Sequence, residues 1–544
     1  MLENTSGGTP LDPATASGRP SRRQVLRWMG IAGAATAVPI GLAACEPATP
    51  PQPQPLTPDP SMRGLGFIGG TDTVLGTGAW CWFQSPRTSF GPNGVLWLGS
   101  SVGTSAPDKG AVQATAFDIK ARKVILKRTL TTTQVDDHTS PSVLALGDKV
   151  QISWALHQRV NYLDIADGST NGSLVSRRIK RPGALTAPGR GMAYSSAHIV
   201  KGVRWILYRG EEFSWNLLTS LDGVTWQYRG LVIKPAYSGA RPYVVAVSDG
   251  DRLHLTVTDN NPTEYRGTSV YAGTLEWDLT MKRSDGTVVG SVGAKAPMPK
   301  KFTRLVEGIP GFSEALDDDF WQCDLRFIDN HPTGVLSHRD NWPADGDRED
   351  DDGPTSVGSY RHRYLWIRQR PTGWIVEPLC WGGSELCSTQ PDYSGLVAQD
   401  PSDATRVVVS TNVHPVTGKA LVSEADGRVH WELFQGKRVG EGSWQFTALT
   451  QDSVLDNLRP SIAAGGPYKA LSWMRGTYRG WRDFDTEIVV RRAVAPPVTP
   501  APSSTSSPAV ASSAAAPAAT SSARGPVEVP KGPDPTSDDA VYPS

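Results

Sequence analysis

Between residues 64 and 492, apolar and polar side chains alternate with period two in many short segments, and no segment has a convincing helical period. Turn-forming pairs such as Asp222 with Gly223 separate these segments repeatedly. The pattern predicts an all-β body made of short strands, as in a sandwich, barrel or propeller. The clearest period-two segments are 95–99, 150–156, 204–209, 252–258, 364–368 and 406–413.

The size of this body favours a propeller. Residues 64–492 contain no obvious linker, and a propeller grows by adding four-stranded blades, whereas a single sandwich does not reach this length. One turn also resembles the Asp box that joins blade strands in sialidase-like propellers. Its residues are Ser220, Asp222, Gly223, Thr225 and Trp226.

Two histidines are predicted to be neighbours at the open end of a hairpin. A two-residue turn at 147–148 sets Leu146 opposite Lys149, and the same register sets His138 opposite His157. Imidazoles titrate near neutral pH, so such a pair has the chemistry of a catalytic site. The alternative is that both rings only form hydrogen bonds within a blade.

The next hairpin places a second reactive pair by the same counting. Its turn at 201–202 sets Tyr194 opposite Arg209. Alone, this pair would suggest structural stacking. Beside the histidine hairpin, it indicates a shared site.

The charge balance excludes some classes of partner. The 54 Lys and Arg residues equal the 54 Asp and Glu residues, so nothing indicates nucleic acid as a partner. The 55 Gly, 44 Pro and 18 Trp fit a turn-rich β protein.

Residues 1–45 have the features of an export signal. Arg22 and Arg23 form a twin-arginine motif, and the apolar run at 28–44 is short for a membrane span of about 20 residues. The run ends in a lipobox-like sequence at Cys45, which predicts lipidation of Cys45 and anchoring on the outer face of the bacterial membrane. An ordinary signal peptide with a chance cysteine is the alternative.

Two low-complexity segments flank the predicted propeller at 64–492. Residues 46–63 are rich in Pro and predict an extended linker. Residues 493–544 are dominated by Pro, Ser, Ala and Thr, which predicts a disordered tail.

Seven motifs follow one another in order along almost the whole β body. They are GAWCWFQSPR from Gly78, DDHTSP from Asp136, YRG from Tyr208, RPY from Arg241, TDNNP from Thr258, DNLRPSIAAG from Asp456 and LSWMRGTYRGWRDFDTEIV from Leu471. Together these motifs resemble the bacterial-neuraminidase-repeat family that includes ulvan lyases. The resemblance implies a seven-bladed propeller that cuts a sulfated, uronate-containing polysaccharide by β-elimination.

The resemblance also implies roles for individual residues. The two catalytic histidines of the family fall on His138 and His157, its catalytic tyrosine on Tyr194 and its carboxylate-neutralising arginine on Arg209. Tyr243 of the RPY motif and Asn261 are the implied substrate-binding residues. Asn261 stands where the family commonly has His, and further departures occur at Ser85, Thr139 and Ser140.

These residue types suit β-elimination beside a uronate. Arg209 can neutralise the carboxylate while the C5 proton is removed. Tyr194 and one histidine would divide the acid and base roles, with Arg209 lowering the pKa of the Tyr194 phenol. Which residue is acid and which is base stays open.

A structural zinc is a further candidate, because some family members carry one and the chain has suitable ligand types. A disulfide between Cys380 and Cys387 is the competing interpretation. No organic cofactor is expected. The zinc candidates are Cys323, Cys380, Cys387 and His338, with His331 as an alternative histidine.

The sequence therefore predicts a monomeric, surface-anchored polysaccharide lyase. Two other functions remain open. One is a non-catalytic propeller that binds a glycan or a cell-surface partner, since a fold does not fix a function. The other is a sialidase-like glycoside hydrolase.

Overall fold

The computed structural model describes residues 54–495, except for 83, 85–86, 158–159, 170–172, 181–190, 264–266, 310–317 and 340–361. The predicted signal segment with Cys45, most of the predicted linker and nearly all of the predicted tail therefore lie outside the described residues. No helix in the described part of the chain is both long and apolar enough to span a membrane.

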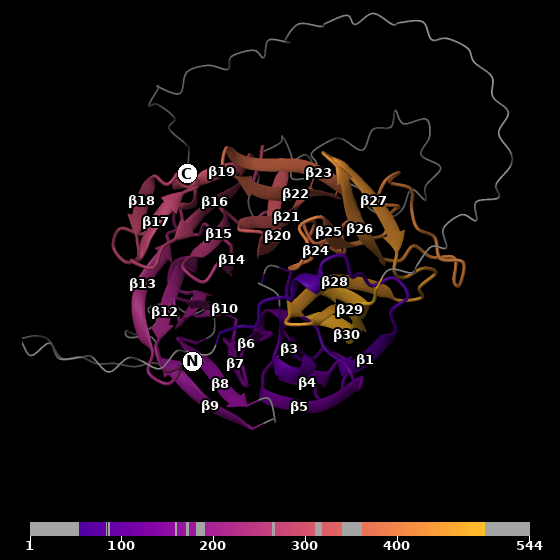
Figure 1. Ribbon diagram of the computed structural model, residues 1–544, viewed down its shortest axis with the longest axis horizontal. Coiled ribbons are helices and arrows are strands. Elements are labelled where there is room, and N and C mark those ends of the chain that lie inside the picture. The colour runs from indigo at the N-terminus through magenta and orange to yellow at the C-terminus, as the bar shows by residue number, and fades with distance from the viewer. Residues whose placement is uncertain are drawn as a thin grey trace, which may run out of the picture. The chain divides into compact units, whose positions relative to one another are not determined.

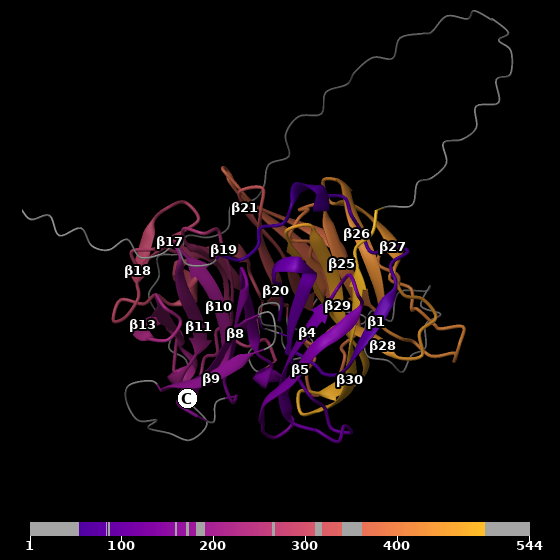
Figure 2. The same ribbon diagram turned by 60° about the horizontal axis from the view of Figure 1, so that its bottom comes forward.

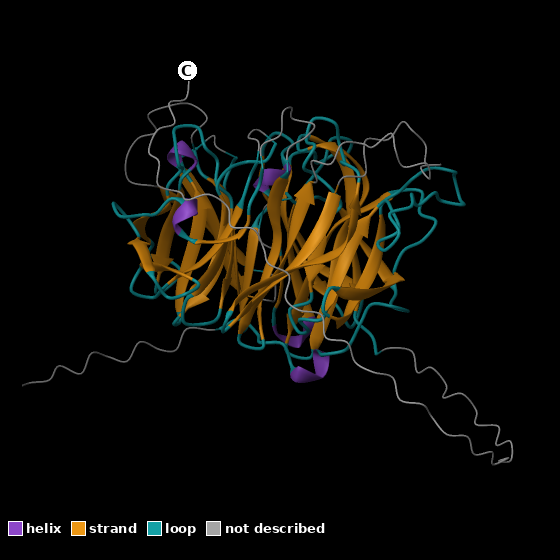
Figure 3. Ribbon diagram, turned by 90° about the horizontal axis from the view of Figure 1, so that it is seen from above, coloured by secondary structure: helices purple, strands orange, loops and turns teal. Residues whose placement is uncertain are grey.

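The described strands form seven antiparallel sheets that are arranged as the blades of a ring (Figure 1). This confirms the predicted all-β, seven-bladed propeller. Short apolar strands separated by turns can bury both faces only by stacking sheet on sheet, and the ring gives every blade two neighbours. Figure 3 shows that the helical turns lie at the rims of the sheets.

The first three blades follow one another along the chain, each with its innermost strand first. The first contains β2 (Thr88–Phe90), β3 (Val95–Ser101), β4 (Ala111–Asp118) and β5 (Lys123–Thr132). The second contains β6 (Ser142–Leu146), β7 (Lys149–Trp154), β8 (Tyr162–Ser169) and β9 (Leu174–Lys180). The third contains β10 (Ala193–Val200), β11 (Val203–Arg209), β12 (Trp215–Ser220) and β13 (Gln227–Ile233).

The next three blades repeat this order, and the fourth has two additional strands. The fourth contains β14 (Val244–Ser248), β15 (Leu253–Thr258), β16 (Val270–Leu275), β17 (Thr280–Arg283), β18 (Val288–Ser291) and β19 (Thr303–Val306). The fifth contains β20 (Asp319–Ile328), β21 (His331–Arg339), β22 (His362–Arg370) and β23 (Gly373–Gly383). The sixth contains β24 (Val397–Gln399), β25 (Arg406–Thr411), β26 (Glu432–Gly440) and β27 (Ser443–Ala448).

The seventh blade joins the two ends of the propeller. Its strands β28 (Asp456–Gly465), β29 (Tyr468–Gly480) and β30 (Asp483–Arg492) come from the end of the body. Its outermost strand, β1 (Asp72–Thr77), comes from the beginning and pairs with β30. Figure 2 shows β1 beside the later strands of this blade. Closure of the ring therefore depends on hydrogen bonds between residues some 400 positions apart.

Of the five short 3₁₀ helices in the described part of the chain, the first precedes β1 and the other four connect strands. One of them, η3, carries a predicted catalytic residue. They are η1 (Pro60–Met62), η2 (Pro92–Gly94), η3 (Asp137–Thr139), η4 (Glu211–Phe213) and η5 (Pro299–Lys301).

The Asp-box-like turn forms between β12 and β13. The Asp222 carboxylate accepts hydrogen bonds from the backbone N–H groups of Val224 and Thr225, at 2.8 and 2.7 Å. Because the strands are antiparallel, this turn lies at the end of the blade opposite to the start of β10. It stabilises the hairpin on the face away from the predicted catalytic residues.

The packing of the closing blade gives a test of how strongly closure contributes to stability. Trp473 is completely buried with Phe67, Leu433 and Val489, and its indole N–H donates to Asn457 Oδ1 at 2.9 Å. We expect Trp473→Ala to lower the free energy of unfolding by about 3–5 kcal/mol, because it leaves a cavity and an orphaned amide.

Urea unfolding followed by circular dichroism measures this change. Trp277→Ala is the control, because Trp277 is 42% exposed and its loss should cost about 1 kcal/mol or less. Equal losses in the two variants would contradict the packing role of Trp473.

Candidate active site

His138 lies in the 3₁₀ turn η3, directly before β6. Asp136 caps this turn, because its side chain accepts a hydrogen bond from the backbone N–H of His138 at 3.0 Å. The predicted hairpin register is confirmed where the strands pair: Leu146 lies opposite Lys149, and the pairing ends at Ser142. The count from the turn places His138 in a strand, but His138 lies in the 3₁₀ turn before the strand.

The two histidine rings nevertheless stack on each other. Their centroids are 3.9 Å apart and their planes differ by only 6°. His157, from the loop after β7, and His138 both place Nδ1 on one carboxylate: Asp136 Oδ1 lies 2.9 Å from His138 Nδ1 and Oδ2 lies 3.0 Å from His157 Nδ1. A single buried carboxylate therefore fixes the orientation of both rings.

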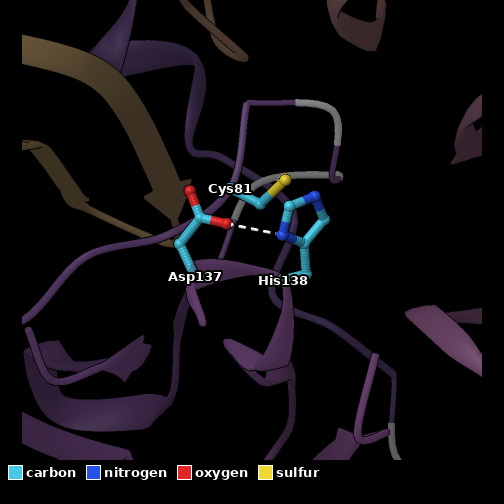
Figure 4. Close-up of side chains that lie close together, drawn as sticks. All are labelled: Cys81, Asp137 and His138. Carbon is cyan, nitrogen blue, oxygen red and sulfur yellow. Dashed lines mark ion pairs between the residues drawn. The ribbon is translucent and has the colours of Figure 1, made fainter. Parts of the chain in front are cut away.

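A second carboxylate, that of Asp137, contacts the same ring nitrogen of His138 (Figure 4). Asp137 Oδ1 lies 2.8 Å from His138 Nδ1, and the Tyr478 hydroxyl donates to Asp137 Oδ2 at 2.7 Å. The sulfur of Cys81 lies near both groups, within a set of atoms that are all less than 4.8 Å apart. His138 is thus enclosed by acidic groups.

These surroundings raise the pKa of His138. Burial alone would lower it, but the acidic groups around the ring raise the pKa of His138 well above the ordinary value. The Cys81 thiol has the largest raising effect, and burial raises the pKa of the Asp137 carboxyl in turn. The acidic groups are the Cys81 thiol, the Tyr194 phenol and the Asp137 and Asp136 carboxyls.

His157 is shifted in the opposite direction. Burial, followed by repulsion from His138, lowers the pKa of His157 to about 3, although Asp136 acts against this shift. Burial also acts on Asp136, but attraction to His138 and the hydrogen bonds of both rings hold the pKa of Asp136 below its ordinary value. At neutral pH the pair is therefore a protonated His138 beside a neutral His157.

The proton positions on His157 follow from its partner. Since Asp136 is ionised, Nδ1 of neutral His157 is assigned as the donor to Asp136 Oδ2. The lone pair of His157 then lies on Nε2. This ring also has the more exposed side chain of the two, at 15% against 6% for His138.

Tyr194 occupies an unusual backbone position. The hairpin begins as expected, with Val200 opposite Val203, but a β-bulge between Ala193 and Ser196 shifts the register. Ala193, not Tyr194, therefore lies opposite Arg209, so the predicted cross-strand pair is wrong. Tyr194 has φ of 54°, a left-handed conformation that costs about 1–3 kcal/mol for a bulky residue.

The bulge still brings the two side chains together. The guanidinium carbon of Arg209 lies 4.3 Å from the centroid of the Tyr194 ring, and this ring lies 5.3 Å from that of His138 and 5.8 Å from that of His157. Tyr194 and Arg209 are each only 2% exposed. All four predicted catalytic residues thus converge in one buried cluster, which we call the tetrad: His138, His157, Tyr194 and Arg209.

The phenol of Tyr194 is protonated. Burial raises the pKa of Tyr194 well above its ordinary value and outweighs the opposing effects of Arg209 and His138. The expectation that Arg209 gives a lowered phenol pKa is therefore not met. Burial also acts against the charge of Arg209, but Tyr194 and Tyr243 raise the pKa of Arg209, which remains cationic.

Of the two predicted substrate-binding residues, one contacts the tetrad. Tyr243 precedes β14, and its ring lies 5.1 Å from the guanidinium carbon of Arg209 and 5.6 Å from the Tyr194 ring. Asn261 follows β15 and accepts from the backbone N–H of Thr263 at 3.1 Å. None of the hydrogen bonds of Asn261 within the described residues reaches the tetrad.

Sequence reasoning did not assign roles to several residues that hold the tetrad. Trp481, in the turn between β29 and β30, presents its ring edge-on to both histidines at 5.2 and 5.3 Å. Asp136, Asp137 and Tyr478 fix the imidazoles. The DDH and YRGW strings contain these residues, but only the fold shows that blades two and seven meet there.

The predicted zinc ligands are not brought together. His338 stacks on Phe320 at 4.2 Å and pairs with Asp318, Cys323 lies at a bulge in β20, and Cys380 lies opposite Tyr364. A tetrahedral zinc needs ligand atoms within about 4 Å of one another. Neither group of clustered ligand atoms among the described residues contains a predicted zinc ligand, so these residues do not fit the ion. Cys380 and Cys387 are not joined by a disulfide either.

No family profile matches this chain, and no curated protein sequence matches it either. The predicted membership of the bacterial-neuraminidase-repeat family therefore stays a prediction.

Comparison with solved structures finds matches at very low sequence identity. The crystal structure of polysaccharide lyase Uly1 has a TM-score of 0.42 and 10% identity, covering 76% of this chain and 90% of the other. A Penicillium chrysogenum α-L-arabinanase gives 0.35 and 12%, covering 77% and 97%. Chaetomium thermophilum Raptor gives 0.38 and 10%, covering 78% and 29%. These likenesses concern the fold alone.

The opposite pKa shifts of the two histidines predict opposite pH dependences of stability. Neutral, buried His157 contributes stability that is present above an unfolded pKa of about 6.5 and is lost as the pH falls toward 3. His138, whose pKa is raised, contributes stability that is present below about pH 6.5 and is lost as the pH rises through its folded pKa.

Urea unfolding of His157→Gln and His138→Gln between pH 4.5 and 8.5 tests this assignment. We expect His157→Gln to reduce the loss of stability on acidification and His138→Gln to reduce the loss on alkalinisation. Slopes that change in the same direction in both variants would show that the protonation states are assigned wrongly.

Proposed function

We propose that this protein is a polysaccharide lyase that cleaves a uronate-containing, ulvan-like glycan by β-elimination. The observation that carries the proposal is the convergence of the tetrad, in which a fixed guanidinium and a neutral imidazole both lie beside one protonated phenol. The motif resemblance to ulvan lyases suggests the class of polymer.

The first requirement of the reaction is neutralisation of the uronate carboxylate. The C5 proton becomes acidic enough only if the negative charge that develops on the carboxylate is stabilised. Arg209 is cationic, buried and held against the rings of Tyr194 and Tyr243, so its guanidinium is preorganised to accept a carboxylate. Protonated His138 adds a second positive charge close by.

The second requirement is a base and an acid. We assign the base to His157, because Asp136 holds its Nδ1–H and leaves the Nε2 lone pair for the C5 proton. We assign the acid to Tyr194, whose raised pKa keeps the O–H proton available for the leaving O4.

The bond changes balance without any other reactant. The C5–H bond breaks as His157 takes the proton, and its electron pair forms the C4–C5 double bond. The C4–O4 bond breaks, and O4 receives the Tyr194 proton. The products are an unsaturated uronate end and a new hydroxyl, and water is not consumed.

The proposed cellular location fits this substrate. Export by the twin-arginine route and a lipid on Cys45 would hold the enzyme on the outer face of the membrane, where it meets polymers too large to enter the cell. The Pro-rich segment at 46–63 would act as a spacer.

One observation favours a non-catalytic, glycan-binding propeller as the second candidate. Tyr194 and Arg209 are each 2% exposed, and a purely structural cluster would be just as buried. A sialidase-like hydrolase is the third candidate, and its products would carry new reducing ends without unsaturation.

Variants of the tetrad test the proposal on ulvan. The absorbance of unsaturated uronate ends in the ultraviolet measures turnover. We expect Tyr194→Phe and His157→Gln to lower kcat by about 10²–10⁴, because each removes one proton-transfer group. We expect Arg209→Gln to lower kcat/KM by at least a similar factor.

A matched pair elsewhere in the chain provides the control. The guanidinium carbon of Arg178 lies 3.6 Å from the centroid of the Tyr162 ring on the outer strands of the second blade. Tyr162→Phe and Arg178→Gln should leave kcat within about twofold of the parent. Glycan binding by the parent without any unsaturated product would favour the binding propeller instead.

The pH profile of kcat/KM tests which residue is the base. A base with a pKa of about 3 stays deprotonated far below the ordinary histidine value, so we expect the acidic limb of the profile to fall well below pH 6. An acidic limb near pH 6.5 would exclude His157 in this state and assign the proton abstraction to another group.

A further inference from the structure

Two arginines other than Arg209 are buried near the axis of the ring. Arg87, directly before β2, is 1% exposed, and Arg459, in β28, is 3% exposed. Arg459 lies at a β-bulge with φ of 49°, which turns this residue out of the regular ladder. The two residues come from neighbouring blades, the first and the seventh.

Both guanidiniums bind the same residue. Arg87 Nε donates to the side-chain oxygen of Gln84 at 2.8 Å, and Arg459 Nη2 donates to the backbone oxygen of Gln84 at 3.1 Å. Arg87 Nη1 also donates to the backbone oxygen of Ser195 in β10 at 2.8 Å. Arg87 thus links the first blade to the third. Both positive charges also lie beside Gln84, because each guanidinium donates a hydrogen bond to it.

No carboxylate in the described part of the chain pairs with either arginine. Their hydrogen bonds go to neutral oxygens, while Arg87 Nη2 and Arg459 Nε are buried and have no partner among the described residues. Three acidic groups act on Arg459, namely Cys323, Asp324 and Cys81, and the one carboxylate among them, Asp324, is already bound to Arg326 at 3.0 Å. Asp324 also accepts from the backbone N–H of Gln399 at 3.1 Å.

Burial of two guanidinium groups without a counterion destabilises the folded protein. Guanidiniums remain protonated in proteins, and a buried charge without an opposite charge costs several kcal/mol. Burial lowers the pKa of Arg87 to about 9, with Cys81 acting against this shift and repulsion from Arg459 adding to it. A negative charge between the two groups would remove both penalties, which water cannot do.

We infer that Arg87 and Arg459 form a binding site for one small monovalent anion of the size of chloride, with Arg87 Nη2 and Arg459 Nε as donors. The inference does not depend on the lyase reaction.

The site adjoins the tetrad through Gln84. The side-chain nitrogen of Gln84 donates to the backbone oxygen of His138 at 2.9 Å, and Ser140 Oγ donates to the same Gln84 oxygen that accepts from Arg87. The anion would therefore neutralise positive charge close to the backbone of His138 and stabilise the folded protein.

Thermal unfolding of the full chain tests the site in solution. Sodium chloride or bromide replaces sodium gluconate at constant ionic strength, because gluconate is too large to enter. We expect the halides to raise Tm saturably, by about 3–5 °C at a hundredfold excess over Kd. Arg87→Gln should abolish this rise, whereas Arg229→Gln, at an exposed arginine, should retain it. Sulfate, which is larger and divalent, should not reproduce the rise.

Bromide-soaked crystals of the parent locate the ion directly. We expect an anomalous difference peak about 3.3 Å from Arg87 Nη2 and Arg459 Nε. This measurement decides the case if Arg87→Gln does not fold, and Arg459→Gln is the second variant. A Tm that is equal in halide and gluconate, a halide effect that Arg87→Gln retains, or crystals without this peak would each overturn the inference.

Discussion

The pairing of β1 with β30 is the constraint on which the arrangement of the centre depends. β1 ends at Thr77, so closure of the seventh blade fixes the path of the chain through Cys81 and Gln84 immediately afterwards. The same blade presents Tyr478 from β29 and Trp481 from the turn before β30. Asp137 and His138 of the second blade then meet residues from both ends of the propeller body. The ring closure and the tetrad are therefore one structural unit.

Buried charges lie among the aromatic and aliphatic side chains at the centre of the ring. Asp136 and Asp137 face a protonated histidine, while the three arginines at 87, 209 and 459 bring positive charge into the same interior. In such surroundings small differences in distance decide which group carries a proton. His138 and His157 show this, because both contact the Asp136 carboxylate but only His138 is protonated at neutral pH.

The sequence predicted the propeller and the members of the tetrad, but not the geometry that joins them. Counting residues outward from the two predicted hairpin turns gave the correct strand register next to those turns. Leu146 lies opposite Lys149 there, and Val200 lies opposite Val203. The same counting failed at the open ends, because the 3₁₀ turn at His138 and the bulge at Tyr194 interrupt the period of two. The raised pKa of Tyr194 depends on burial by other blades, which no local pattern contains. For the same reason suitable ligand types could not reveal that Cys323, Cys380 and His338 lie on strands that keep them apart.

The stacked imidazoles have a consequence for how this protein exchanges protons with its solvent. Because one aspartate anchors both rings at 3.9 Å, a proton added to either ring changes the proton affinity of the other. As the pH rises, the pair then loses its protons in two coupled steps, first from His157 and then from His138. A spectroscopic titration that follows one ring would therefore register both protonation steps, because the shared Asp136 carboxylate couples the two rings.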